Sequence, residues 1–348
     1  MKRLVLVLCA LAMFVASVFG TYNIAFIVKA TDSEFWQYTI VGAKNAEKDL
    51  QGLVKVTVYG PASEADIDKQ VAILEDVIRT KPDAIVISST SSHATAPALN
   101  KAYQQGIKII LIDNLVIDAN YHSFLATNNR FGGGLAAEKM VEFLKKAGKP
   151  LKGKVGLISS MAGVQVLIDR DDGFKTRLKE LAPELEILPT RYVDNDIAKA
   201  MAAMEDLVTA YGDELVAVFA DNNHTGVGVA RVVEERRLHD KVIAVAYDSD
   251  PQEVEALRNG SLKALIVQDP HGMGYKGVMF AFMAIHGEPL PKYFDTGVYV
   301  VTKENMDQLK WVLDPYLRKD TDMRLVSERG GLHPPLCKIV KTAEDWPI

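Results

Sequence analysis

Short apolar runs recur along the chain, and each of them ends in a polar side chain. The runs and their polar ends are 24–28 with Lys29, 84–87 with Ser88, 109–112 with Asp113, 155–158 with Ser159, 217–220 with Asp221 and Asn222, 242–247 with Asp248, and 264–267 with Gln268. Amphipathic segments of helical length separate the runs, and this alternation is typical of a parallel sheet with helices on both faces. Because ligands of such sheets bind outside the carboxyl ends of the strands, the polar ends predict the lining of a binding site.

The alternation predicts two successive groups of elements, and therefore an α/β fold with two lobes. The first group has strands near 23–28, 54–59, 84–88, 108–113 and 123–127, with helices near 35–50, 65–80 and 93–105. The second has strands near 154–159, 187–193, 215–220 and 242–247, with helices near 131–147, 170–181, 197–210 and 225–237. Helices near 250–259 and 272–286, a strand near 297–302 and a C-terminal helix near 303–317 complete the prediction.

The first 20 residues have the pattern of a secretory signal peptide. Lys2 and Arg3 precede an apolar stretch over 4–19, and Gly20 follows it at the position of a cleavage site. The stretch is shorter than the ~20 residues of a membrane-spanning helix, so cleavage is favoured over anchoring. We therefore expect the mature protein in the periplasm or another extracytoplasmic space. Its single remaining cysteine, Cys337, excludes an internal disulfide.

The length of the chain and its net charge limit the classes of function that it can have. Removal of 20 residues from 348 leaves 328, which suits two lobes of about 150 residues each. The net charge is −5, and no basic stripe or arginine-rich helix is present, so nucleic acid is not an expected partner. The glycines at 132–134 and at 226 and 228 lack the full dinucleotide pattern, and the seven histidines lack metal-ligand spacing. We therefore expect no cofactor and no metal.

Several segments of the chain resemble one family. They are 24–29 with Phe35 and Trp36, 112–114, 126–129 ahead of Gly132 and Gly133, 170–174, 218–222, 246–248, 267–270 with 272–275, and 295–298. In order and spacing they resemble the ribose-binding-protein group of type I periplasmic sugar receptors, which serve ABC importers. The resemblance covers essentially the whole mature chain.

The resemblance implies two Rossmann-like doubly wound lobes joined by three crossover strands, near Thr127, Gln268 and Thr296. It implies an N-terminal lobe of 21–127 plus 269–296 and a C-terminal lobe of 128–268 plus 297–348. A pentose, hexose or polyol would be held between the lobes, and the partners would be the permease subunits of an ABC transporter. We expect a monomer and no enzymatic activity.

Four residues are expected to hold the sugar by stacking and by charged hydrogen bonds. Phe35 and Trp36 open the first helix after a strand, where aromatic rings stack on the apolar faces of a pyranose or, alternatively, pack the helix on its sheet. Asp113 and Asp248 stand at strand ends, where each accepts two hydroxyl groups or, alternatively, caps a helix. Asp250, ahead of a proline, is the better helix cap.

The amides and the arginine complete the expected contacts. Asn222 and Gln268 offer both donors and acceptors, which suits hydroxyl groups. Asp221 and Asn223 flank the same turn and are weaker candidates, equally suited to cap the next helix. Arg170 precedes a Gly-Phe pair as an arginine does in the family; it either binds the sugar or pairs with the acids beside it.

Three positions depart from the ribose receptors and bear on the substrate. Asn114 replaces the arginine that follows the first aspartate, and Ile168 stands where related receptors have a second arginine. Lys29 adds a charge at the end of the first strand, where it either contacts the ligand or reaches solvent at the rim of the lobe. This lysine resembles receptors for polyols, pentoses and the autoinducer-2 furanose, so ribose itself is disfavoured.

Other functions are less well supported. A receptor for an autoinducer-2-type furanose signal is the main alternative. A sugar-sensing domain of a transcription regulator shares the fold, but the leader and the lack of an N-terminal helix-turn-helix argue against it. A sugar-active enzyme is disfavoured because the chain lacks an activated nucleophile, a metal motif and a nucleotide loop.

Overall fold

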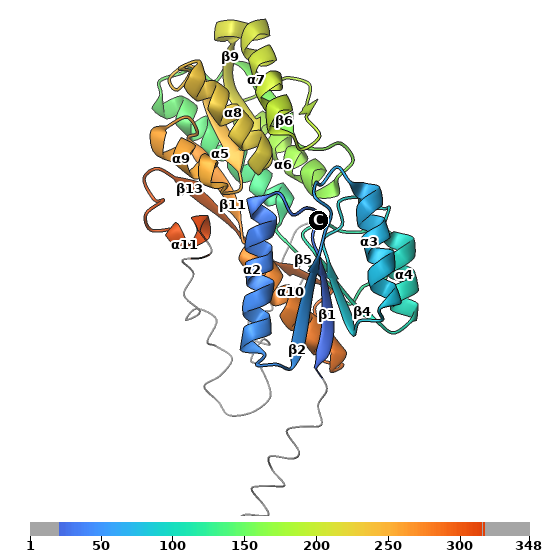
Figure 1. Cartoon of the computed structure of the whole chain (residues 1–348). Helices are drawn as coiled ribbons and strands as arrows, with labels where there is room; N and C mark the ends of the chain where they lie inside the picture. Colours follow the sequence, from blue (N-terminus) through green and yellow to red (C-terminus); the bar gives the residue numbers. More distant parts are fainter. Residues whose placement is uncertain (1–20, 315, 317–348) are drawn as a thin grey trace, which may run out of the picture.

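The computed structural model describes residues 21–314 and 316. The predicted signal peptide over 1–20 and the tail beyond 316 lie outside the described residues. The chain forms two lobes, each a sheet with helices on both faces, and this confirms the predicted α/β fold (Figure 1). Within the described part, no helix is both long and apolar enough to cross a membrane.

The first lobe, here called the N-lobe, contains a parallel six-stranded sheet with the order β12-β5-β4-β3-β1-β2. Its strands are β1 (Tyr22–Ile27), β2 (Val54–Tyr59), β3 (Ala84–Ile87), β4 (Lys108–Ile112), β5 (Ser123–Ala126) and β12 (Tyr293–Asp295). Its helices are α2 (Glu34–Asp49), α3 (Ile67–Arg79), α4 (Ala96–Gln104) and α10 (Pro270–Ile285). Helices α2 and α10 cover one face, and α3 and α4 cover the other (Figure 1). The central strand β3 is apolar throughout because both of its faces are covered.

The second lobe, here called the C-lobe, contains a seven-stranded sheet with the order β13-β11-β10-β9-β6-β7, and β8 also pairs with β6. Its strands are β6 (Gly153–Ser159), β7 (Leu185–Ile187), β8 (Arg191–Tyr192), β9 (Leu215–Ala220), β10 (Ile243–Tyr247), β11 (Ala264–Gln268) and β13 (Val298–Thr302). Only β13 among these runs antiparallel, against β11. Its helices are α5 (Asn129–Lys146), α6 (Gln165–Leu181), α7 (Ile197–Tyr211), α8 (Asn223–Glu235), α9 (Pro251–Asn259) and α11 (Lys310–Leu313).

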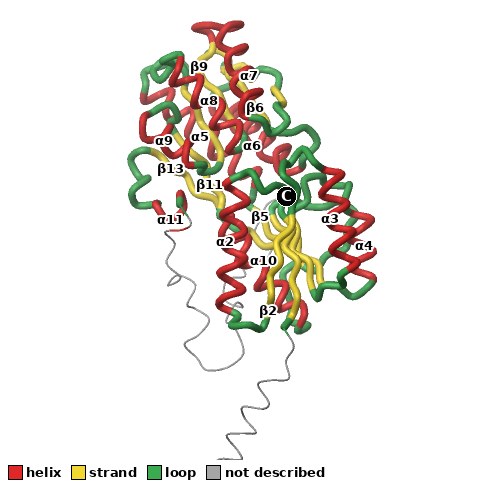
Figure 2. Tube along the Cα trace, in the orientation of Figure 1, coloured by secondary structure: helices red, strands yellow, loops and turns green. Residues whose placement is uncertain are grey.

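The chain passes between the two sheets three times. It leaves the N-lobe sheet after β5 and enters α5, returns after β11 into α10, and leaves again between β12 and β13. The carboxyl ends of the parallel strands of both sheets face the junction, and Figure 2 shows loops in green gathered between the two yellow sheets. The polar residues that end the strands are therefore brought to one region.

Three sequence-based expectations about elements are wrong. The strand expected over 187–193 is two short strands, β7 and β8, with Pro189 between them, because proline cannot donate a hydrogen bond to a neighbouring strand. The helix expected over 303–317 forms only over Lys310–Leu313 within the described residues. The side chain of Asn305 bonds to the Thr302 N–H at 2.8 Å and to the Val300 carbonyl at 3.0 Å, which favours a turn there. The short strand β12 was not predicted.

Candidate functional site

A narrow cavity of about 40 Å³, open to solvent, lies between the lobes at the carboxyl ends of the strands. Eight of the nine residues expected from the sequence line it: Lys29, Phe35, Trp36, Asp113, Arg170, Asn222, Asp248 and Gln268. The ninth, Asn114, does not.

Lys29 and Asp113 form an ion pair in the N-lobe wall of the cavity. The Nζ atom of Lys29 lies 2.6 Å from Oδ2 of Asp113, and each side chain is only 5% exposed. The hydroxyl of Ser88 donates to the same oxygen at 3.1 Å. Lys29 therefore lies inside the cleft, and the alternative that it reaches solvent is wrong. Asp113 caps no helix; it follows β4 in a left-handed conformation with φ of 62°.

Asp248 and Gln268 form a second polar pair on the C-lobe side. Gln268 Nε2 donates to Asp248 Oδ1 at 2.8 Å, and both residues are buried. The other amide atom of Gln268, Oε1, is buried and has no hydrogen-bond partner. A buried acceptor without a partner is costly, so a ligand hydroxyl that donates to it would be favourable. Asp250, as expected, caps α9 by accepting from the Gln252 N–H.

Two aromatic rings contribute the apolar part of the N-lobe wall. Phe35 and Trp36 meet edge to face with their centroids 4.9 Å apart, and both line the cavity while also packing on the N-lobe core. The indole N–H of Trp36 donates to Glu64 at 2.6 Å, which fixes the orientation of the ring. The rings pack the helix on its sheet and also face the cavity, while their stacking on a sugar stays a prediction.

Arg170 is held by the C-lobe itself. Its guanidinium donates to Asn129 Oδ1 from Nε at 3.2 Å and from Nη2 at 2.8 Å, bonds to the carbonyl of Asp221, and stacks on the Tyr247 ring at 3.5 Å. Helices α5 and α6 must approach closely for this, and Gly133 permits it, because a Cβ there would lie 1.9 Å from the Arg170 carbonyl oxygen. The arginine lines the cavity, but these bonds use much of its donor capacity.

Asn222 both lines the cavity and caps α8. Its Oδ1 accepts from the Thr225 N–H at 3.0 Å, and its Nδ2 donates to Asn195 Oδ1 at 2.7 Å. The expectation that Asp221 or Asn223 caps this helix is therefore wrong. Asp221 instead accepts from the hydroxyl of Ser159 and from the Ser160 N–H.

Asn114 lies behind the cavity, fully buried in the N-lobe. Its Nδ2 donates to the carbonyl of Ser89 at 2.9 Å, and it lies 3.3 Å from Oγ of Ser92. The left-handed turn at Asp113 directs the next side chain away from the cleft. The expected direct contact between Asn114 and a ligand is not supported by this position.

The cavity also has lining residues that the sequence did not identify. They are Glu64, Ser160, Val164, Val166 and Leu167, together with the weaker candidate Asn223. Glu64 and Ser160 lie in loops, and the three aliphatic residues lie where α6 begins. Apolar residues in the first turn of a helix have the same pattern as core residues, so the sequence carried no signal for them.

The two lobes touch on either side of the cavity. Nδ2 of Asn223 in the C-lobe donates to Oγ of Ser33 in the N-lobe at 3.1 Å. The backbone N–H of Gln165 in the C-lobe donates to Oγ of Ser92 in the N-lobe at 3.3 Å. These two hydrogen bonds join the lobes directly beside the cavity.

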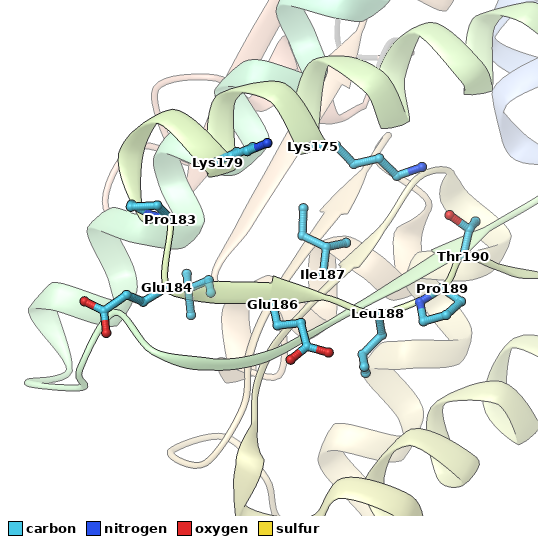
Figure 3. Close-up of a pocket in the computed structure, with 10 residues that line it drawn as sticks. Lys175, Lys179, Pro183, Glu184, Glu186, Ile187, Leu188, Pro189 and Thr190 are labelled. Atoms are coloured by element: carbon cyan, nitrogen blue, oxygen red, sulfur yellow. The ribbon is translucent and has the colours of Figure 1, made fainter.

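A larger groove of about 630 Å³ lies elsewhere, between α6 and the edge strand β7 (Figure 3). Lys175 and Lys179 lie along the helix on one side, and Ile187 points toward that helix, whereas Glu186 and Leu188 point away from it. None of the expected site residues line this groove. We therefore place the functional site in the cavity between the lobes.

Acidification is expected to change ligand affinity and stability in opposite directions. Burial raises the pKa of Asp248 to about 6, and burial also raises the pKa of Asp171 and Asp221. Ligand hydroxyls need the ionised carboxylate, so affinity should fall about tenfold between pH 7 and pH 5. The folded protein takes up these protons at higher pH than the unfolded chain, so the unliganded protein should gain stability over the same interval.

Calorimetric titration and thermal unfolding at pH 5, 6 and 7 measure both effects. Asp248→Asn removes the titrating group of the cavity and should flatten the pH dependence of affinity. An affinity that is independent of pH in the parent protein would show that no ionised Asp248 contacts the ligand.

Comparisons with known proteins bear on this site. Residues 24–289 match the family model described as periplasmic binding protein domain. A carbohydrate transporter solute binding protein from Agrobacterium radiobacter, in complex with D-arabinose, superimposes with a TM-score of 0.80 at 36% identity, covering 84% of this chain and 99% of that one. An ABC transporter solute binding protein from Agrobacterium vitis, with bound D-fucose, gives a TM-score of 0.79 at 34% identity, covering 84% and 100%. The ribose import binding protein of Escherichia coli K12 is 28% identical over 307 residues, which is 87% of this chain and 99% of that protein.

Proposed function

The chain belongs to the periplasmic binding protein domain family, and on this premise we propose that it is an exported receptor that captures a monosaccharide or polyol and delivers it to an ABC importer. The observation that carries the proposal is the cavity between the lobes. Polar strand ends of both sheets line it, and two aromatic rings lie beside them. Carboxylates, amides and aromatic rings are the groups that bind the hydroxyls and the apolar faces of a sugar.

The relatives support a sugar as the ligand. The two solved structures contain D-arabinose and D-fucose, and the Escherichia coli relative is a ribose import protein. Lys29 in the cavity favours a polyol, a furanose or a pentose other than ribose. The reason is that its ammonium group is a point charge, whereas the guanidinium group of an arginine is planar and binds with two parallel hydrogen bonds. The same lysine keeps a furanose signal of the autoinducer-2 type as the second candidate.

Catalysis is not part of the proposal. Within residues 21–314 and 316, no histidine or cysteine lines the cavity. The hydroxyl of Ser160 donates to Asn195 at 2.9 Å, so it has no base that would activate it. The family is one of solute-binding receptors, and binding with release is the activity that this lining supports.

The proposal also covers the location of the protein, its partners and the movement of its lobes. We propose that 1–20 is a cleaved signal peptide and that the mature monomer works in the periplasm or another extracytoplasmic space with permease subunits. We also propose lobe boundaries that give an N-terminal lobe of 21–127 plus 269–296 and a C-terminal lobe of 128–268 plus 297–348. The three crossings then act as hinges, and a ligand that contacts both lobes favours the closed state.

Titration of the mature protein with pentoses, hexoses, polyols and autoinducer-2 tests the proposal. We expect at least one of these ligands to bind with a Kd in the micromolar range or below. Small-angle scattering should show a smaller radius of gyration with that ligand, because the lobes close on it. Failure of every ligand to bind would overturn the receptor assignment. Tight binding with an unchanged radius would contradict the hinge and place the ligand on a rigid site.

A further inference from the structure

The polar groups of the cavity offer a ligand several acceptors, and Lys29 offers the donors that its bond to Asp113 leaves over. Arg170 and Asn222 donate mainly to other groups of the C-lobe, as described above. Asp113 and Asp248 keep lone pairs beyond their bonds to the protein, since a carboxylate accepts about four hydrogen bonds. Gln268 Oε1 has no partner. The cavity therefore suits a ligand whose hydroxyls donate to these acceptors.

One wall of the cavity has no hydrogen-bonding side chain. Val164, Val166 and Leu167 line the cavity from the start of α6, are buried, and pack together as a small apolar cluster of their own. We call these three residues the aliphatic wall. It comes from the C-lobe, whereas the aromatic rings of the site come from the N-lobe.

The aliphatic wall is docked onto the opposite lobe. Gln165, between two of its residues, donates its backbone N–H to Ser92 Oγ of the N-lobe at 3.3 Å. Asn114 Nδ2 also donates to that oxygen at 3.3 Å and so helps to position Ser92. Closure of the lobes thus brings the wall against whatever part of the ligand faces it.

We propose that the aliphatic wall selects sugars that lack a hydroxyl on the carbon facing it, namely a 6-deoxyhexose or a pentopyranose over the corresponding hexose. The inference rests on the proposed function and names the substrate class of the same cavity. A hydroxymethyl group against the wall would lose its bonds to water without gaining a partner. A methyl group at the same place would be removed from water favourably.

Matched sugars test the proposal on the unmodified protein. D-galactose, D-fucose and L-arabinose share one ring stereochemistry and differ only in carrying hydroxymethyl, methyl or hydrogen on C5. L-galactose, L-fucose and D-arabinose form a second such series, and D-glucose, 6-deoxy-D-glucose and D-xylose a third. In the series that binds, calorimetry should give the methyl sugar an affinity about tenfold or more above that of the hydroxymethyl sugar.

Equal or tighter binding of the hydroxymethyl sugar would overturn the inference and leave the receptor function intact. That result would mean that the aliphatic wall only packs against the ring. Absence of binding across all three series, together with the failure of polyols and autoinducer-2, would instead overturn the proposed function itself.

A pair of variants locates the preference in the wall. Val164→Thr with Val166→Thr keeps the side-chain volume and adds hydroxyls, so the preference for the methyl sugar should shrink about tenfold. Val216→Thr with Val254→Thr, at half-buried positions of the C-lobe outside the cavity, is the matched control and should keep the parent preference. An unchanged preference in the first variant would show that the wall does not set it. If that variant does not fold, the matched sugars alone decide.

Discussion

Alanine in place of Asp248 is expected to weaken binding of the tightest sugar by about 3 kcal/mol, more than a hundredfold in Kd. Asp248 is 6% exposed, lines the cavity and holds Gln268 in place at 2.8 Å. Hydrogen bonds to a charged group each contribute about 1.5–3 kcal/mol, and the substitution also leaves the Gln268 amide without this partner. Calorimetric titration measures the loss.

Stability should behave differently from affinity in the Asp248 variants. Burial of the carboxylate opposes folding at neutral pH, as its raised pKa indicates, so its removal relieves that cost. Alanine adds about 1 kcal/mol of backbone strain at φ of 82°, which asparagine tolerates. We therefore expect Asp248→Asn to melt no lower than the parent, with an affinity between those of the parent and the alanine variant.

Asp206→Ala is the matched control for this prediction. Asp206 is an exposed carboxylate on α7, away from the cavity. It should bind and melt like the parent. Parent-like affinity in Asp248→Ala as well would remove Asp248 from the binding site.

The sequence predicted most of the lining of the candidate site because a parallel sheet places its strand ends together. Lys29, Asp113, Asp248 and Gln268 each stand at or just after the end of an apolar run, and all four line one cavity. The period of the apolar positions fixes which residues end each strand. The sheet then fixes which end of every strand faces the cleft.

The features of the candidate site that the sequence did not predict depend on backbone turns and on contacts between distant segments. Asn114 follows Asp113 directly, yet the left-handed turn at Asp113 directs it into the N-lobe. The aliphatic wall lies in a helix start whose pattern is that of a core. The ion pair between Lys29 and Asp113 joins positions 84 residues apart (113 minus 29). Their positions at strand ends predicted that both lie in the cleft, but did not predict that they pair.

The helices and strands also differ in how well the sequence predicts them. Long periodic segments such as α2 and α5 were predicted within two residues, because their apolar spacing is strong. The three-residue strand β12 has too few positions to show a period. The turn after β13 depends on the side chain of Asn305, which competes with the helix that the apolar spacing favoured.

Methionine in place of Lys29 is expected to lower both sugar affinity and stability. The side chain keeps its length but loses the charge, and Asp113 then remains buried with the hydroxyl of Ser88 as its remaining side-chain donor among the described residues. Breaking a buried ion pair by removing one partner costs about 3–5 kcal/mol. Thermal unfolding should therefore shift down by several degrees, and calorimetry should show affinity lower by about 1–3 kcal/mol.

The combined variant Lys29→Met with Asp113→Asn separates the two effects. It leaves no unpaired charge, so stability should return toward that of the parent. Affinity should stay low, because both polar groups that we propose to contact the sugar are altered. Lys199→Met is the control, since its ion pair with Asp194 is exposed and contributes about 0–1 kcal/mol. If Lys29→Met binds the tightest sugar like the parent and only its stability falls, the lysine supports the fold of the N-lobe wall and takes no part in choosing the substrate.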